Sequence, residues 1–204
     1  ALGFSGGFPG DFIAQTLEDS NIQSDFVQVD EDTRINVKLK SGQETEINAP
    51  GPKVTHAQFE QLLSQIRRTT NDDIVIVAGS VPNSIPSDAY AQIAQITEKT
   101  GAQLVVDAEK DLVETVLPYR PLFIKPNKDE LEVMFNTTVK SDEDVIKYGK
   151  EILKKGAQSV IISLGGDGAI YVDQHQSIKA VNPQGHVVNT VGSGDSTVAG
   201  MVAG

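Results

Sequence analysis

The sequence predicts an α/β protein with a mostly parallel sheet and helices on both faces of that sheet. Three runs rich in Val, Ile and Leu are each long enough for one strand, at residues 74–79, 104–107 and 159–163. Segments with helical spacing of apolar residues separate them. Apolar strands joined by helices indicate a parallel sheet that is covered on both sides. Ligands bind such a sheet beyond the carboxyl ends of its strands, so the residues after each strand are the first candidates for a site.

The first part of the chain has a different pattern. Four glycines in residues 1–10 precede an apolar pattern at residues 11–17, which indicates a strand end, a glycine-rich loop and a short helix. Alternation of apolar and polar residues then predicts strands at 26–29, 34–39 and 44–47, with a hairpin turn at Ser41 and Gly42.

Regular alternation of helices and strands is expected after residue 54. The apolar run 74–79 is expected to be a buried strand, and Gly101 suits the end of the helix before the next strand. Further strands are expected at 123–125 and 170–172, and the helices are expected at residues 55–70, 87–100, 127–136 and 141–155.

Composition limits the function classes. The chain has 204 residues, no cysteine and a net charge of −11. The absence of cysteine excludes disulfides, thiolate metal sites and cysteine nucleophiles. The negative charge argues against a nucleic-acid or anionic-membrane partner. No run is long enough to cross a bilayer and no signal-peptide pattern begins the chain, so we expect a cytoplasmic protein.

The strongest functional pattern is the segment 189–200, Asn-Thr-Val-Gly-Ser-Gly-Asp-Ser-Thr-Val-Ala-Gly. Gly192, Ser193 and Gly194 let a ligand approach the backbone, and their N–H groups at a helix N-terminus would favour an anion. Asp195 adds a carboxylate that could accept a proton. An anion site beside a base is what phosphoryl transfer needs. The structural alternative is a tight turn with Asp195 as the N-cap of a helix.

Three more strand ends carry candidate residues, each with a structural alternative. Ser80 follows residues 74–79 in a turn that Pro82 could simply end. Asn127 and Glu130 have the spacing of a helix capping box, and oxygen ligands of this kind also suit Mg²⁺. Ser163 and Gly165 fit a glycine-rich hairpin turn.

Several other sites are absent from the sequence. His56, His175 and His186 show no metal-ligand spacing. No Walker-type phosphate loop, Rossmann fingerprint or Gly-x-Ser-x-Gly nucleophile elbow is present.

The segment 189–202 resembles the C-terminal signature of the ribokinase/PfkB family of carbohydrate kinases, in which Ser193 is usually Ala. The resemblance implies a ribokinase-like fold, with an α/β core at residues 1–21 and 50–204 and a β lid at residues 22–49. Family members are longer, so it also implies that this chain is an internal piece. ATP and Mg²⁺ are the implied cofactors.

The resemblance also implies roles for particular residues. Asp195 would be the catalytic base, and the N–H groups of Gly192, Ser193 and Gly194 would hold the transferred phosphoryl group. Arg34, Asn36 and Lys38, which share one face of a strand, would meet the substrate phosphate, although a solvated face is the structural alternative. Ser80, Gly6 and Gly7 would also lie near the substrate. The residues near the nucleotide would be Lys125, Asn127, Ser163 and Gly165. Glu130 would hold Mg²⁺ through water.

Segments 33–38, 79–82 and 191–200 are most similar to the branch of the family that converts D-fructose 1-phosphate to fructose 1,6-bisphosphate. Phosphorylation of tagatose 6-phosphate is the alternative within the family. A non-catalytic piece that binds a nucleotide or a phosphosugar is the alternative from another class. Lids of this family often pair between subunits, so a homodimer is expected.

Overall fold

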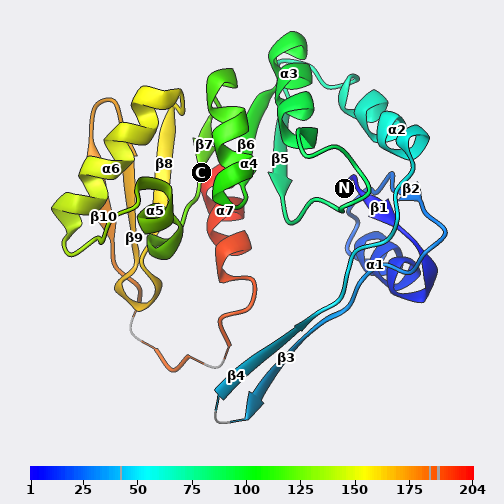
Figure 1. Ribbon diagram of the computed structural model, residues 1–204, viewed down its shortest axis with the longest axis horizontal. Helices are drawn as coiled ribbons and strands as arrows, with labels where there is room; N and C mark the ends of the chain where they lie inside the picture. Colours follow the sequence, from blue (N-terminus) through cyan, green and yellow to red (C-terminus); the bar gives the residue numbers. More distant parts are fainter. Residues whose placement is uncertain (42, 184, 188) are drawn as a thin grey trace. The chain divides into compact units, whose positions relative to one another are not determined.

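The computed structural model (Figure 1) describes residues 1–41, 43–183, 185–187 and 189–204; the side chains of residues 38, 40, 41, 43, 44 and 46 lie outside this description. The chain forms two compact units, Ala1–Arg68 with Ser80–Ala89 and Thr69–Gly79 with Tyr90–Gly204. These limits differ from the expected lid at residues 22–49, and the division into core and lid stays a prediction. In the described ranges, no helix is long and apolar enough to span a membrane.

The first unit contains two small sheets and two helices. Its first strands pair in parallel, and the next two pair antiparallel as a ribbon, as the alternating sequence predicts. In chain order the elements are β1 (Phe4–Ser5), α1 (Gly7–Asp19), β2 (Val27–Gln28), β3 (Asn36–Ser41), β4 (Gln43–Asn48) and α2 (His56–Ile66).

Helix α1 begins earlier than the sequence suggested. The glycine-rich segment expected as a loop is its first turn, which starts at Gly7. Gly7 has a φ of +60°, and a Cβ there would overlap the side chain of Asp32. A Cβ on Gly6 would overlap the carbonyl oxygens of Glu31 and Val29. These glycines therefore serve close packing at the start of the helix, which the local pattern could not reveal.

The second unit is built on a six-stranded sheet with the order β10-β9-β8-β7-β6-β5. Strands β5 to β8 are parallel, and β9 and β10 are antiparallel additions. The strands are β5 (Ile74–Ala78), β6 (Gln103–Asp107), β7 (Phe123–Ile124), β8 (Ser159–Ser163), β9 (Ala169–Asp173) and β10 (Ser177–Ala180). The helices are α3 (Ala89–Thr100), α4 (Lys110–Val116), the short 3₁₀ helices η1 (Leu117–Tyr119) and η2 (Gly165–Asp167), α5 (Lys128–Phe135), α6 (Asp142–Lys155) and α7 (Ser193–Ala203).

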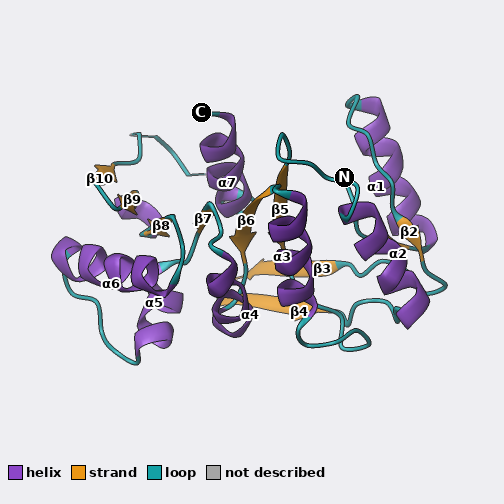
Figure 2. Cartoon of the chain, turned by 90° about the horizontal axis from the view of Figure 1, so that it is seen from above, coloured by secondary structure: helices purple, strands orange, loops and turns teal. Residues whose placement is uncertain are grey.

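Helices cover both faces of this sheet (Figure 2). On one face Val198 of α7 packs in a cluster with Val105, Phe123 and Ile161 from three neighbouring strands. Helices α3 to α6 lie on the other face, where Gly149 of α6 lies against the strands. The predicted fold class, a mostly parallel sheet between helical layers, is confirmed.

Strand β5 differs from its prediction as a buried strand. Its side chains alternate between half-buried and exposed, and Ile74 and Ile76 are 40% and 45% exposed. The reason is its position, because within the described residues β5 pairs with β6 alone and stands at the end of the sheet order. An apolar run predicts a strand that is buried on both faces, but the sequence of the run does not show whether a neighbouring strand covers its edge.

Candidate active site

The site is built around the start of α7 in the second unit. Gly192 is the N-cap of this helix and has a φ of +79°, a left-handed conformation that glycine adopts without steric cost. A turn precedes it, in which the Ser193 N–H donates to the Thr190 carbonyl over 3.2 Å. The first helical hydrogen bond runs from the Ser196 N–H to the Gly192 carbonyl, over 2.9 Å.

This helix start has free donors. No side chain caps α7, so the structural alternative of Asp195 as N-cap is not what the chain adopts. In the described part of the chain, no hydrogen bond is recorded for the N–H groups of Gly194 and Asp195, whereas the N–H of Ser193 is already used in the turn. The Asp195 side chain is exposed in the first turn. A carboxylate and two free amides thus share one helix turn.

Lys125 brings a buried positive charge to the same place. The residue follows β7 and is only 7% exposed. A Cβ built on Gly194 would lie 3.3 Å from Lys125 Nζ and 3.5 Å from its Cε, so the ammonium lies directly against the first turn of α7. The helix N-terminus and the ammonium both favour an anion there.

Asp107 is the counterion of this lysine. Its Oδ1 lies 3.2 Å from Lys125 Nζ. The register of the sheet brings them together, because Val106 of β6 pairs with Ile124 of β7 and the next residues along the chain are Asp107 and Lys125. Side chains adjacent across parallel strands point to the same face.

Tyr90 of α3 completes this cluster. Its hydroxyl donates to the Gly79 carbonyl over 2.8 Å, at the end of β5. Burial, and then the charge of Asp107, raise the pKa of Tyr90 to about 12. The hydroxyl therefore stays neutral at any physiological pH and acts as a fixed donor.

Asn127 and Glu130 form the capping box that the structural alternative predicted. Asn127 Oδ1 accepts the Glu130 N–H over 2.8 Å, and Glu130 Oε2 accepts the Asn127 N–H over 2.7 Å. Asn127 also bridges to Ser163 at the end of β8. These residues lie two to five positions after Lys125, at the same ends of the strands.

Ser163 and Gly165 lie at the hairpin between β8 and β9. The Leu164 N–H donates to the Gly168 carbonyl over 2.8 Å, which closes the turn, and Gly165 has a φ of +59°. The Asn182 side chain donates to the Gly165 carbonyl over 2.9 Å. The hairpin turn is sufficient to explain why Ser163 and Gly165 occur at these positions. Their contact with a nucleotide stays a prediction.

The remaining predicted residues belong to the first unit. Arg34 and Asn36 are exposed at the base of the β3–β4 ribbon, and the side chain of Lys38 lies outside the described part. The N–H of Gly6 donates to Thr33 Oγ1 over 3.0 Å, and Gly7 follows it at the start of α1. Ser80 is exposed.

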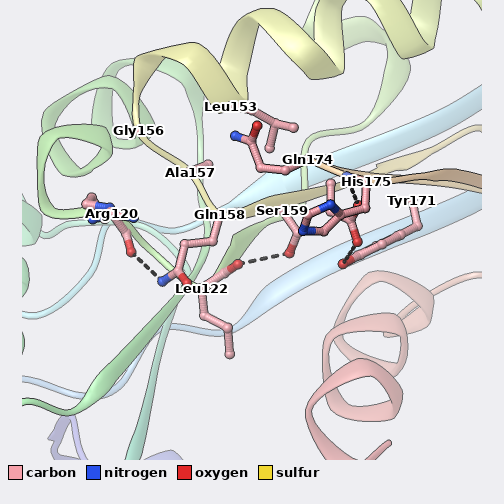
Figure 3. A pocket seen from close by; sticks show the side chains of 11 residues that line it. Arg120, Leu122, Leu153, Gly156, Ala157, Gln158, Ser159, Tyr171, Gln174 and His175 are labelled. Atoms are coloured by element: carbon pink, nitrogen blue, oxygen red, sulfur yellow. Dashed lines mark hydrogen bonds between the residues drawn. The ribbon is translucent and has the colours of Figure 1, made fainter.

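A separate cavity of about 470 Å³ lies at the opposite ends of the strands in the second unit (Figure 3). Tyr171 donates to Asp173 there over 3.0 Å, Ser159 donates to the Leu122 carbonyl, and Gln158 donates to the Arg120 carbonyl. None of the predicted site residues lines it. His56, His175 and His186 are exposed, and the described residues contain no group of three or more His, Asp or Glu that could hold a metal ion.

Known proteins share this arrangement over the whole chain. A 1-phosphofructokinase of Bacillus subtilis (strain 168) is 43% identical over 204 residues, which are 100% of this chain and 67% of that protein. A D-tagatose-1-phosphate kinase of Bacillus licheniformis is 37% identical over 99% of this chain and 67% of its own length. The crystal structure of a candidate phosphofructokinase from Staphylococcus aureus superposes with a TM-score of 0.88 at 80% identity, covering 100% of this chain and 67% of that one.

The chain therefore spans about two thirds of the length of these relatives. Residues 1–204 match the pfkB family carbohydrate kinases from end to end. Together with the parallel sheet and the α7 site, this match confirms the family predicted from the segment 189–202: the chain belongs to the pfkB family of carbohydrate kinases.

Proposed function

We propose that the whole protein carrying this chain transfers the γ-phosphoryl group of ATP to a sugar phosphate, D-fructose 1-phosphate, and forms fructose 1,6-bisphosphate. The names of the relatives support the reaction class, because they include a 1-phosphofructokinase at 43% identity and a D-tagatose-1-phosphate kinase at 37% identity. The observation that carries the proposal is the exposed Asp195 carboxylate beside two free amides and the buried Lys125 ammonium.

Each of these groups has a task in the transfer. Asp195 accepts the proton of the sugar 6-hydroxyl as its oxygen attacks the γ-phosphorus. The N–H groups of Gly194 and Asp195, with the predicted help of Gly192, hold charge on the oxygens of the transferred group. Lys125 supports the same oxygens with its positive charge. The bond from the γ-phosphorus to the bridging oxygen of ATP breaks, and ADP leaves.

The donor groups fit ATP and Mg²⁺. Amides and an ammonium suit phosphate oxygens. Glu130 uses Oε2 for the Asn127 N–H, and Oε1 has no recorded partner among the described residues. A carboxylate oxygen of this kind suits a water ligand of Mg²⁺, which would supply positive charge to the phosphates. Lys125, Asn127, Ser163 and Gly165 are the proposed nucleotide contacts.

The β3–β4 ribbon is the proposed lid. Arg34, Asn36 and Lys38 would bind the existing phosphate of the sugar, for which the planar Arg fork is well suited. Ser80, Gly6 and Gly7 are proposed near the sugar, and closure of the lid would exclude water.

The other face of the ribbon supports the expected homodimer. Val37 pairs with Ile47 across the two strands, and exposed apolar side chains continue along this face. They are Ile35, Val37, Leu39 and Ile47. An apolar patch of this kind is typical of a protein interface, so we propose that two ribbons cover one another.

A coupled assay of ADP release tests the function. The whole protein carrying residues 1–204 is given fructose 1-phosphate, tagatose 1-phosphate, tagatose 6-phosphate, fructose 6-phosphate and free fructose, and kcat/KM is compared. Fructose 1-phosphate is expected to have the highest value. A preference for either tagatose phosphate would keep the reaction and change the substrate.

Turnover of free fructose alone would overturn the lid assignment. Binding of ATP without any turnover would favour a non-catalytic binding protein. Arg34→Ala gives a second readout, because loss of a phosphate contact should raise the KM for the sugar phosphate and leave the KM for ATP nearly unchanged.

A further inference from the structure

Asp107 is a half-buried carboxylate that lies beside the buried ammonium of Lys125. Asp107 is the last residue of β6 and Lys125 directly follows β7, so both come one position after the paired residues Val106 and Ile124. The Lys125 N–H donates to the Val106 carbonyl over 3.2 Å. This backbone bond fixes the start of the lysine side chain. The ion pair of 3.2 Å then fixes its end, with side chains that are 8% and 20% exposed for Lys125 and Asp107.

Without Asp107, the position of the Lys125 ammonium would be electrostatically unfavourable. Burial disfavours the charged form of an ammonium, and the N-terminus of α7 adds a positive partial charge beside it. A lysine side chain is long and rotates freely, so it could turn away from Gly194. The carboxylate offsets both costs and holds the ammonium in place.

The surrounding hydrogen bonds leave Asp107 available for this task. Tyr90, the neighbouring group on α3, donates its hydroxyl to the Gly79 carbonyl. The Asp107 carboxylate acts on Tyr90 through its charge and forms its ion pair with Lys125.

We propose that Asp107 is a positioning residue for phosphoryl transfer. It holds the Lys125 ammonium against the first turn of α7 at Gly194, where the transferred phosphoryl group binds, and it acts through Lys125 alone. This inference rests on the proposed function, since it names a further residue of the same site.

A double-mutant cycle tests it with four proteins: the wild type, Asp107→Asn, Lys125→Met and the double variant. Asp107→Asn is expected to lower kcat/KM for ATP by about 10- to 100-fold, the scale typical of groups that orient metal-binding side chains, which we apply to Lys125. The KM for the sugar phosphate should change less than about twofold, because the pair acts on the other substrate. In the Lys125→Met background, Asp107→Asn should change kcat/KM by less than about twofold.

Two further variants complete the design. Asp107→Glu keeps the charge and should recover part of the lost activity. Asp173→Asn changes a carboxylate at the end of β9 that lines the separate cavity at the opposite ends of the strands, and it should leave kcat unchanged. Asp173 is a fair control because it also accepts local hydrogen bonds, from the N–H groups of His175 and Gln176.

Gly194→Ala tests the same contact from the other side and does not depend on the folding of the Asp107 variants. Its Cβ would meet Lys125 Nζ at 3.3 Å and Cε at 3.5 Å, so the lysine must shift. Alanine favours a helix more than glycine does, so a loss of activity could not come from a weaker α7. The loss should disappear in the Lys125→Met background.

The outcomes separate the two proposals. Equal effects of Asp107→Asn with and without Lys125 would overturn the inference, because Asp107 would then act on the reaction by another route. An unchanged kcat/KM in Asp107→Asn would also overturn it while the kinase function stands. If the wild type turned over no sugar phosphate, the function would fall, and the same cycle in the Kd of a non-hydrolysable ATP analogue would still decide whether Asp107 acts through Lys125.

Discussion

Helices α5 and α7 both begin beyond the carboxyl ends of the parallel strands, and they treat their first amides in opposite ways. At α5 the side chains of Asn127 and Glu130 satisfy one another's backbone N–H groups. At α7 the N-cap residue is Gly192, which has no side chain, so no side-chain hydrogen bond caps this helix. The first helix uses its terminal donors for its own stability. The second leaves the N–H groups of Gly194 and Asp195 without a partner among the described residues, as the proposed phosphoryl site requires.

The charges around the two helix starts follow the same division. Asp129 and Glu130 supply negative charge to the first turn of α5, which stabilises a helix N-terminus. Beside Gly194 of α7 lies the ammonium of Lys125. A helix start with a neighbouring cation and free amides favours the binding of an anion. The contrast is the reason why we propose α7, and not α5, as the helix that binds the transferred phosphoryl group.

The largest expected effect comes from Asp195→Asn, which keeps the shape of the side chain and removes the base. Turnover should fall by about two to four orders of magnitude, the usual scale for general-base catalysis. The affinity for ATP should change little, because the amides of α7 remain. Steady-state kinetics with calorimetry of ATP binding check both statements. Turnover near that of the wild type would contradict the assignment of Asp195 as the general base.

Gly192→Ala should disturb the open helix start through its conformation. Nothing lies within 4 Å of a Cβ at this position, but the φ of +79° is unfavourable for alanine. We expect a loss of about 1–2 kcal/mol in the free energy of unfolding. Gly200→Ala in the same helix also meets nothing within 4 Å and has an ordinary helical φ, so it should gain about 0.5–1 kcal/mol. Urea unfolding measures both, and equal effects would contradict the assignment of Gly192 as a left-handed cap.

Asn127→Ala should remove the cap of α5 and lower the free energy of unfolding by about 1 kcal/mol. Asn127→Asp keeps an acceptor for the Glu130 N–H and should retain most of the stability. Ser141→Ala at the start of α6, where the hydroxyl accepts the Asp144 N–H over 3.3 Å, is the matched control and should have a similar cost. If Asn127→Ala had the same free energy of unfolding as the wild type, the capping box would not contribute to the stability of α5.

An effect on stability that depends on pH is expected at Tyr90. Tyr90→Phe loses the hydrogen bond to Gly79 and should cost about 0.5–1.5 kcal/mol at neutral pH. The pKa of Tyr90 is raised from 10.0 to about 12 in the folded protein, so the folded state holds this proton more tightly than the unfolded state. The contribution is complete below pH 10 and is lost as the pH rises toward 12. The difference in stability between wild type and variant should narrow over that window, and a constant difference would contradict the pKa shift.

Local patterns were sufficient for most elements of the second unit. The run at 159–163 is β8 to the residue, α5 begins directly after the predicted cap residue Asn127, and α6 begins one residue after the predicted helix start at residue 141. Helix α4 and strand β10 were not predicted. Helix α4 has only seven residues, and all four side chains of β10 are exposed, so neither carries a clear apolar pattern.

Parts of the site depended on contacts between distant residues. Segment 189–200 revealed Asp195 and the glycines, but not that the Ser193 N–H is used by Thr190. The pairing of Asp107 with Lys125 follows from the register of β6 and β7, which only a paired sheet defines. Contact of Gly194 with Lys125 depends on how α7 packs on the sheet, and no local pattern encodes that packing.

Amide NMR of the whole ¹⁵N-labelled protein tests the central claim most directly. A non-hydrolysable ATP analogue is added with Mg²⁺ and the sugar phosphate. The amides of Gly194 and Asp195 should show the largest downfield shifts, because they gain a charged acceptor, whereas Asp144 at the capped start of α6 should stay in place. Shifts at Gly194 and Asp195 no larger than that of Asp144 would contradict the assignment of α7 as the phosphoryl-binding helix.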